Sequence, residues 1–223
     1  MNTQKELLVR LKKMCAVAVF CALAYACTYL KVPVMFLSLE VKDSIIVLCT
    51  LIFGPLWGLA VAIVVPTLEL LTHSGTGVYG WIMNMLSSVT FATVTGLIYR
   101  FKKDFKGAII GLLCGVCSVT AIMLAANLLV TPFYMGVTVQ AVAALIPKVL
   151  LPFNLVKAVL NGAIVLLLYK PLSNILKKTG FLPDEKNVAI ANQKKNWIRS
   201  LTVSLVAISI IVAALAVVFL ILR

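Results

Sequence analysis

The composition of this 223-residue chain indicates an integral membrane protein. Hydrophobic residues make up 62% of it, charged residues 12%, and its mean hydropathy is +1.10. A soluble domain is roughly 45–50% apolar and about 25% charged, so a water-soluble fold could not cover this much apolar surface. The net charge of +13 would suit a nucleic-acid-binding protein, but the basic residues cluster between apolar runs, where they set membrane topology.

Seven apolar runs, bounded by charged or turn-forming residues, predict seven transmembrane helices. In chain order they cover about residues 13–30, 43–53, 56–72, 79–99, 107–130, 149–169 and 199–222. The first run follows Lys12 and Lys13 and is long enough to span, so we expect an uncleaved helix rather than a signal peptide. The second and third runs are separated at Gly54-Pro55, because Pro suits the first turn of a new helix.

We therefore expect an all-α, polytopic membrane protein in three parts. A six-helix membrane domain would occupy residues 1–178, a cytoplasmic polar linker residues 179–198, and a seventh transmembrane helix residues 199–223. The last span holds no ionisable residue between Arg199 and Arg223, so we expect no ligand-binding role for it.

The distribution of Lys and Arg predicts the orientation. With the N-terminus in the cytoplasm, fifteen basic residues fall inside and five outside, as the positive-inside rule favours. Seven spans would then place the C-terminus outside. The outer connections, at about 31–43, 73–78 and 131–148, carry little basic charge and are rich in Gly, Pro, Thr and aromatic residues.

Catalytic and metal-binding motifs are missing from the sequence. The chain has one histidine, no Walker A sequence and no G-x-S-x-G motif, so we expect no enzymatic activity and no metal site. The six cysteines all lie in apolar runs, where free cysteine behaves as a small hydrophobic residue. Cys114-Gly-Val-Cys117 has no second pair and no histidine nearby, so a redox or metal role is not expected.

Polar side chains in membrane spans are costly, which makes each a candidate functional residue. The candidates are Glu40, Lys42, Asp43, Glu69, His73, Asn84, Asn127, Asn154, Lys157 and Asn161. Most map to the outer half of the membrane, which predicts a small-molecule pocket there. Alternatively, the asparagines are hydrogen-bonding contacts between helices. Amide groups would suit a neutral heterocycle with imide-like N–H and C=O groups.

Small residues recur every four positions in the first helix, at Ala18, Ala22 and Ala26. Such a stripe lets another helix approach closely. It predicts either packing within the bundle or a docking face for another membrane subunit.

Several motifs resemble the substrate-binding S components of energy-coupling factor (ECF) vitamin transporters. They are Leu37-Ser-Leu-Glu-Val-Lys-Asp43, Phe53-Gly-Pro-Leu-Trp-Gly58, and Ser74-Gly-Thr-Gly77 followed by Asn84 and Ser87-Ser88. Asn127, Thr131-Pro-Phe-Tyr-Met-Gly136 and Leu151-Pro-Phe-Asn-Leu-Val-Lys157 are most similar to the riboflavin-specific branch. The resemblance covers about residues 9–178, so the seventh span departs from the usual six-helix S component.

The resemblance implies a cell-membrane protein that captures vitamin, here riboflavin, from outside with high affinity. It would associate with a transmembrane coupling subunit and two ATPase subunits, which hydrolyse ATP in its place. No cofactor is implied beyond riboflavin as the transported ligand. The stripe at Ala18, Ala22 and Ala26 is similar to the face by which S components dock on the coupling subunit.

The resemblance also implies the ligand-binding residues. The positions matching Glu40, Asn127, Asn154 and Lys157 would hydrogen-bond the flavin ring and ribityl chain, while other positions line the pocket. The full predicted set is Glu40, Lys42, Asp43, Gly77, Gly80, Asn84, Asn127, Phe133, Asn154 and Lys157, with stacking expected from Phe36, Phe133, Tyr134 or Phe153. The rival interpretations are an S component for another vitamin or flavin-like compound, and a membrane assembly protein without a ligand.

Overall fold

The computed structural model describes residues 2–178 and residue 209. In chain order the elements are α1 (Asn2–Cys27), β1 (Lys31–Val34), β2 (Leu37–Glu40), α2 (Lys42–Phe53), α3 (Pro55–Thr72), α4 (Gly77–Phe101), α5 (Phe105–Met135), α6 (Val139–Leu145), the π-helical turn η1 (Ile146–Leu150) and α7 (Leu151–Lys178). The helical fold expected from the sequence is confirmed. The predicted linker and the predicted seventh span lie outside the described residues, apart from Ser209.

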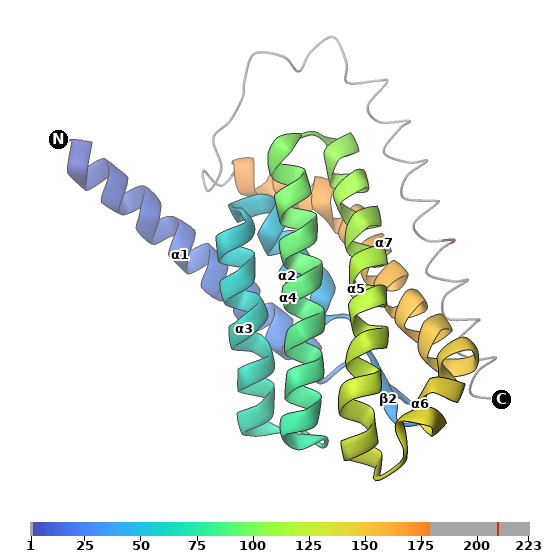
Figure 1. The fold of residues 1–223 in the computed structure, drawn as a ribbon. Coiled ribbons are helices and arrows are strands. Elements are labelled where there is room, and N and C mark those ends of the chain that lie inside the picture. The colour runs from blue at the N-terminus through green and yellow to red at the C-terminus, as the bar shows by residue number, and fades with distance from the viewer. Residues whose placement is uncertain (1, 179–208, 210–223) are drawn as a thin grey trace.

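Four stretches of the described chain are long and apolar enough to cross a membrane. They are α3, α4, α5 and the continuous stretch Val139–Leu176. α1 extends further toward the N-terminus than expected, because residues 2–12 are mostly good helix formers such as Gln, Glu, Lys and Leu. Its N-terminal half projects away from the other helices (Figure 1).

The short helix α2 lies at the centre of the molecule. It packs against α1, α3, α4 and α7, and ten of its twelve residues are buried. Its near-continuous apolar sequence explains this position, because a helix that is hydrophobic on all sides is stable only when neighbours surround it. At about 1.5 Å per residue its length is roughly 18 Å, too short to cross a bilayer by itself.

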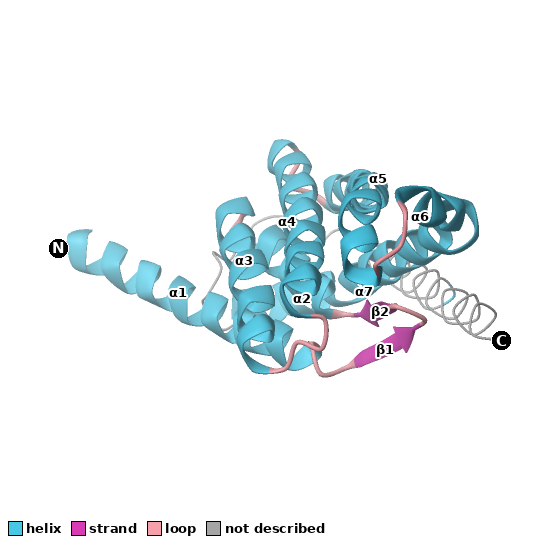
Figure 2. Ribbon diagram, turned by 60° about the horizontal axis from the view of Figure 1, so that its bottom comes forward, coloured by secondary structure: helices cyan, strands magenta, loops and turns pink. Residues whose placement is uncertain are grey.

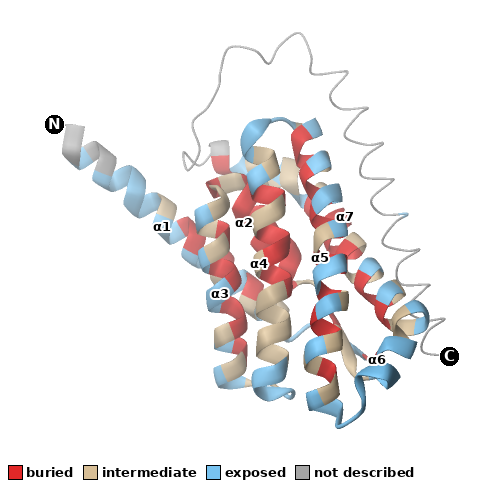
Figure 3. Cartoon of the chain, viewed as in Figure 1, coloured by how far each residue is buried: buried red, intermediate tan, exposed pale blue. Residues whose placement is uncertain are grey.

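The helices around α2 bury a continuous apolar core. Figure 3 shows the buried positions of α3, α4 and α5 facing one another, with exposed positions on the outside. Phe20, Ile46, Val61, Phe91 and Leu112 carry this core from α1 to α5. A β-carbon at Gly115 would lie 2.3 Å from Thr95 Oγ1, so α4 and α5 approach closely there.

The connection between α1 and α2 contains a β-hairpin that the sequence did not predict. β1 and β2 pair antiparallel, with Lys31 opposite Glu40. Apolar residues alternate in both strands, but the turn at Met35-Phe36 lacks the Asn or Gly that usually marks a hairpin. Val34 and Leu39 bury their side chains against Phe153 of α7, so tertiary packing stabilises the hairpin. Figure 2 shows both strands beside the ends of α2 and α7.

The segment 131–148, expected as a loop, is mostly helical. α5 continues through Pro132 to Met135 and ends at Gly136, whose φ of +66° is the left-handed conformation that glycine adopts readily. α6 then begins at Val139, where the Thr138 side chain accepts a hydrogen bond from Ala141 N at 3.3 Å. The hairpin, the α3–α4 connection and the α5–α6 connection all lie at the same end of the bundle (Figure 1).

Candidate ligand-binding site

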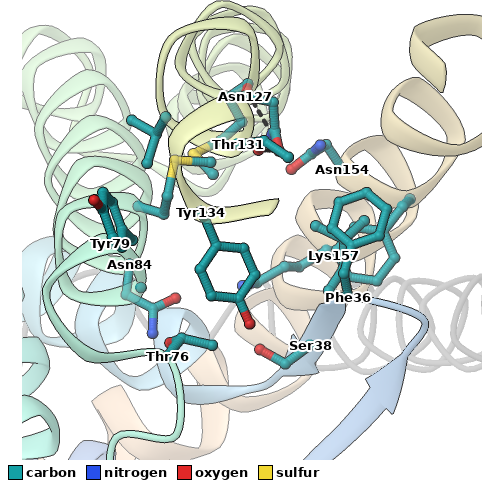
Figure 4. A pocket seen from close by; sticks show the side chains of 16 residues that line it. Phe36, Ser38, Thr76, Tyr79, Asn84, Asn127, Thr131, Tyr134, Asn154 and Lys157 are labelled. Atoms are coloured by element: carbon teal, nitrogen blue, oxygen red, sulfur yellow. Dashed lines mark hydrogen bonds between the residues drawn. The ribbon is translucent and has the colours of Figure 1, made fainter. Parts of the chain in front are cut away.

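An open pocket lies at the end of the bundle where these three connections meet. It contains about 640 Å³ of atom-free space, including the part that opens to solvent. Sixteen described residues line it, from the hairpin, the start of α4, the second half of α5 and the start of α7 (Figure 4). Small-molecule sites are typically lined by apolar and aromatic side chains with a few convergent polar groups, and the lining of this pocket has that composition.

Three asparagine side chains form much of the polar wall. Asn127 on α5 and Asn154 on α7 each donate to a backbone carbonyl one turn earlier, at 2.7 and 2.8 Å. Asn84 on α4 donates to a carboxylate oxygen of Glu69 at 3.2 Å. Thr131 donates to Asn127 Oδ1 at 2.9 Å. With their nitrogens held in this way, Asn84 and Asn154 turn their oxygens toward the pocket (Figure 4) and offer acceptors to a ligand.

Lys157 brings a positive charge to the same wall. It lies one turn after Asn154 on α7, so both side chains share a helix face, and both line the pocket. A smaller adjoining cavity is lined by Asn154 and Lys157 together with Asp43, Ser87 and Asn161. Lys157 therefore stands between the open pocket and a buried polar region of the bundle.

Aromatic side chains supply the apolar part of the lining. Phe36 comes from the hairpin turn, Tyr79 from α4, Tyr134 from α5 and Phe153 from α7. The rings of Tyr79 and Tyr134 lie 6.2 Å apart at an angle of 59°. An aromatic ligand in contact with such rings gains from both burial and ring geometry.

A buried ion cluster lies beside the pocket. Lys42 Nζ, on the first residue of α2, lies 2.5 Å from Glu40 Oε2 of the hairpin and 2.6 Å from Glu69 Oε2 of α3. The Lys42 and Glu40 side chains are each 1% exposed. Burial by itself would raise the pKa of the Glu40 carboxyl, but the charges of Lys157 and Lys42 and hydrogen bonds from Lys42 and Ser38 lower it to about 2.

Asp43 takes part in a second buried polar group. Its two carboxylate oxygens accept hydrogen bonds from Ser88 at 2.5 Å and from Ser87 at 3.2 Å. These contacts connect the start of α2 to the middle of α4. Asp43 lines the smaller cavity and not the open pocket.

A family model described as "ECF transporter, substrate-specific component" matches residues 12–169. The chain belongs to this family. It is thus a transport subunit of a multi-pass membrane system and not itself an enzyme, and the resemblance of its motifs to S components is confirmed.

Individual relatives agree with this assignment. The riboflavin transporter RibU of Staphylococcus aureus (strain TCH60) is 29% identical over 189 residues, covering 80% of this chain and 100% of the relative. The riboflavin transporter FmnP of Bacillus subtilis (strain 168) is 24% identical over 174 residues, covering 72% and 92%. The solved S component of a bacterial ECF transporter has a TM-score of 0.65 and 30% identity, covering 75% of this chain and 99% of that one.

Five residues of the predicted set line the pocket of this S component: Gly80, Asn84, Asn127, Asn154 and Lys157. The structure thus brings together side chains that lie up to 77 residues apart in the sequence. The other five are placed elsewhere. Glu40 and Lys42 belong to the buried ion cluster and Asp43 to the serine contacts, while Gly77 and Phe133 lie outside the lining.

Phe133 and Tyr134 show how helix phase decides which aromatic residue reaches the pocket. Phe133 is 76% exposed, whereas Tyr134, the next residue on α5, lines the pocket. Successive helical residues point about 100° apart, so an error of one position changes the face. The sequence did single out Tyr134 as a stacking candidate, but it could not choose between the two.

The predicted ligand-binding set did not include four hydroxyl-bearing residues that also line the pocket: Ser38, Thr76, Tyr79 and Thr131. One signal was available for Thr131, because it stands four residues after Asn127 and so shares its helix face. Ser38 and Thr76 lie in connections, where spacing alone does not predict which way a side chain points.

Proposed function

We propose that this S component binds riboflavin in the open pocket and serves as the substrate-specific subunit for its uptake. The observation that carries the proposal is the convergence of three asparagines and Lys157 from α4, α5 and α7 on one aromatic-lined pocket. Curated relatives named as riboflavin transporters support the same ligand.

The chemistry of the pocket fits the two parts of riboflavin. The flavin ring is flat and aromatic, which suits contact with Tyr79, Tyr134 and Phe153. Its imide edge offers one N–H between two carbonyl groups, and the ribityl chain offers hydroxyl groups. The oxygens of Asn84 and Asn154 can accept from these donors, and Lys157 can donate to a flavin carbonyl.

The orientation and partners follow from the same proposal. The pocket end would face outside and the basic end, with Arg100, Lys102, Lys103 and Lys106, would face the cytoplasm. The N-terminus would then be cytoplasmic and, if residues 199–223 span, the C-terminus outside. A transmembrane coupling subunit and two ATPase subunits would complete the transporter.

Ligand binding can be tested on the purified chain. The protein is purified in detergent without added ligand, its absorbance spectrum is recorded, and riboflavin is titrated while its fluorescence quenching is followed. We expect copurified flavin or saturable quenching, and at least about tenfold weaker binding when Asn127 or Lys157 is replaced by Ala. Phe133→Ala is the matched control, because that side chain lies outside the lining. Absence of flavin and of quenching would contradict the proposal, and a screen of other vitamins would then identify a different ligand.

The proposed docking face can be tested separately. Ala18, Ala22 and Ala26 are all exposed on α1, whereas Ala16 and Ala24 are buried. A larger side chain in Ala22→Leu should hinder close approach of a coupling helix. We expect this variant to bind riboflavin as the original chain does but to copurify poorly with the coupling subunit. Normal copurification would exclude this face.

A further inference from the structure

The ion cluster of Glu40, Lys42 and Glu69 is in contact with residues of the pocket but does not line it. We infer that Lys42 is a positioning residue of the ligand site: by pairing with both Glu40 and Glu69, it keeps Lys157 and Asn84 available to the ligand. This inference rests on the proposed binding of riboflavin in the open pocket.

The first connection runs from Lys42 through Glu40 to Lys157. Asn161 donates from one amide nitrogen to Glu40 O and to Lys157 O, each at 2.9 Å. These bonds hold the end of β2 against the turn of α7 that carries Lys157. The buried Glu40 carboxylate therefore lies within the electrostatic reach of two ammonium groups, Lys42 and Lys157.

These two lysines have different roles because only one lines the pocket. Lys42 is in direct ion-pair contact with Glu40 and is fully enclosed, whereas Lys157 is half-buried and lines the pocket. Since a buried carboxylate needs a cation or a proton, removing Lys42 would leave Lys157 as the other cation that acts on Glu40, because Lys31 is paired with Glu69 Oε1 at 3.8 Å. Lys157 would then turn toward Glu40, and the pocket would lose its positive charge.

The second connection runs from Lys42 through Glu69 to Asn84. One carboxylate oxygen, Glu69 Oε2, accepts from both Lys42 at 2.6 Å and Asn84 at 3.2 Å. The Asn84 nitrogen is held on Glu69, so its oxygen faces the pocket (Figure 4). Lys42 fixes the position of the carboxylate on which this orientation depends. The same cation thus orders polar groups on two walls.

The test compares riboflavin affinity, measured by fluorescence quenching in detergent, between Lys42→Met and the double variant Glu40→Gln/Lys42→Met. We expect Lys42→Met to weaken binding by about tenfold or more, mainly through faster dissociation. The double variant has no carboxylate at position 40 to attract Lys157, so we expect it to recover most of the affinity. The thermal unfolding midpoint of each variant is measured beside its affinity, because removing one partner of a buried ion pair also destabilises a structural contact. A purely structural role predicts that loss and recovery of affinity follow the midpoint, whereas the positioning role predicts loss of affinity in Lys42→Met protein that is still folded at the assay temperature.

Controls separate this inference from the proposed function. If the original chain does not bind riboflavin, the proposed function fails. If it binds and Lys42→Met binds equally well, or if the double variant is no better than the single one, the positioning role is overturned. Lys148→Met removes one positive charge from an exposed site and should leave the affinity unchanged.

A further variant keeps the inference testable if Lys42→Met does not fold. Glu69→Leu leaves Lys42 and Glu40 as a neutral pair but removes the acceptor that orients Asn84. We expect this variant to remain folded, as judged by size-exclusion chromatography, and to bind riboflavin about three- to tenfold more weakly. Unchanged affinity in a folded Glu69→Leu protein would overturn the Asn84 connection.

Discussion

The side-chain amide of Asn161 makes hydrogen bonds to α2, to the hairpin and to its own helix α7. Its oxygen accepts from Ser44 N at 2.9 Å and Ser44 Oγ at 2.7 Å, and its nitrogen donates to Glu40 O and Lys157 O. The residue is 1% exposed. One amide group therefore joins α7 to the start of α2 and to the end of the hairpin.

Replacing this amide should destabilise the bundle. In Asn161→Ala, the Ser44 and Glu40 backbone groups lose their partner in a buried place, which typically costs about 1–3 kcal/mol for each unsatisfied group. We expect a clearly lower thermal unfolding midpoint in detergent without ligand. Asn174→Ala, on the exposed side of the same helix, is the matched control and should have little effect. Equal midpoints for the two variants would contradict this account of Asn161.

Glu40 predicts an acid-dependent loss of stability. Folding lowers the pKa of its carboxyl from 4.5 to about 2, so the folded state favours the ionised form. The contribution is complete above about pH 4.5 and is lost as the pH falls toward 2. Unfolding midpoints measured across this range should converge for the original chain and Glu40→Gln as the pH falls. Parallel curves would show that Glu40 does not supply this dependence.

Residue type alone identified much of the pocket but not the role of each side chain. Asn84, Asn127, Asn154 and Lys157 were recognisable because polar groups in apolar runs are costly. The same reasoning selected Lys42, which lies in the ion cluster and outside the pocket lining. A contact with a ligand and a contact with a buried carboxylate satisfy the same requirement, so the sequence cannot distinguish them.

At the scale of elements, the long helices were predictable and the connections were not. Apolar runs of helical length gave α3, α4, α5 and most of α7, because each must bury a long apolar face. The hairpin depends on packing of Val34 and Leu39 against Phe153, more than a hundred residues away. Contacts of that kind leave no local signal in the sequence. The sequence therefore did not predict that Ser38 lies in a strand or that Phe36 lies in the turn before it.

Close packing of α4 on α5 gives a prediction at this scale. A β-carbon at Gly115 would lie 2.3 Å from Thr95 Oγ1 and 2.8 Å from the Phe91 ring. We expect Gly115→Ala to lower the thermal midpoint, since overpacking typically costs about 1–3 kcal/mol. Gly162→Ala is the control, because its β-carbon would meet nothing closer than Val116 at 3.7 Å. If Gly115→Ala were as stable as Gly162→Ala, the close approach of α4 and α5 would be in doubt.

At the scale of the whole molecule, the two ends of the bundle have different properties. The pocket, the hairpin and the ion cluster lie together at one end. The α4–α5 connection, with exposed Arg100, Lys102 and Lys103, lies at the other end. The sequence foresaw this division from the distribution of basic charge, because loops that differ in charge alternate along the chain.

From this division we expect that residues 179–223 are not needed for riboflavin binding. Within the described part of the chain, the residues that line the pocket lie between Phe36 and Lys157, and the family match ends at residue 169. The core formed by the described residues likewise runs from α1 to α7. A chain that ends after Lys178 should therefore bind riboflavin with an affinity within about twofold of the full chain, as measured by fluorescence quenching. Binding at least about tenfold weaker in a truncated protein that elutes as a single folded species would instead assign part of the pocket's stability to the tail.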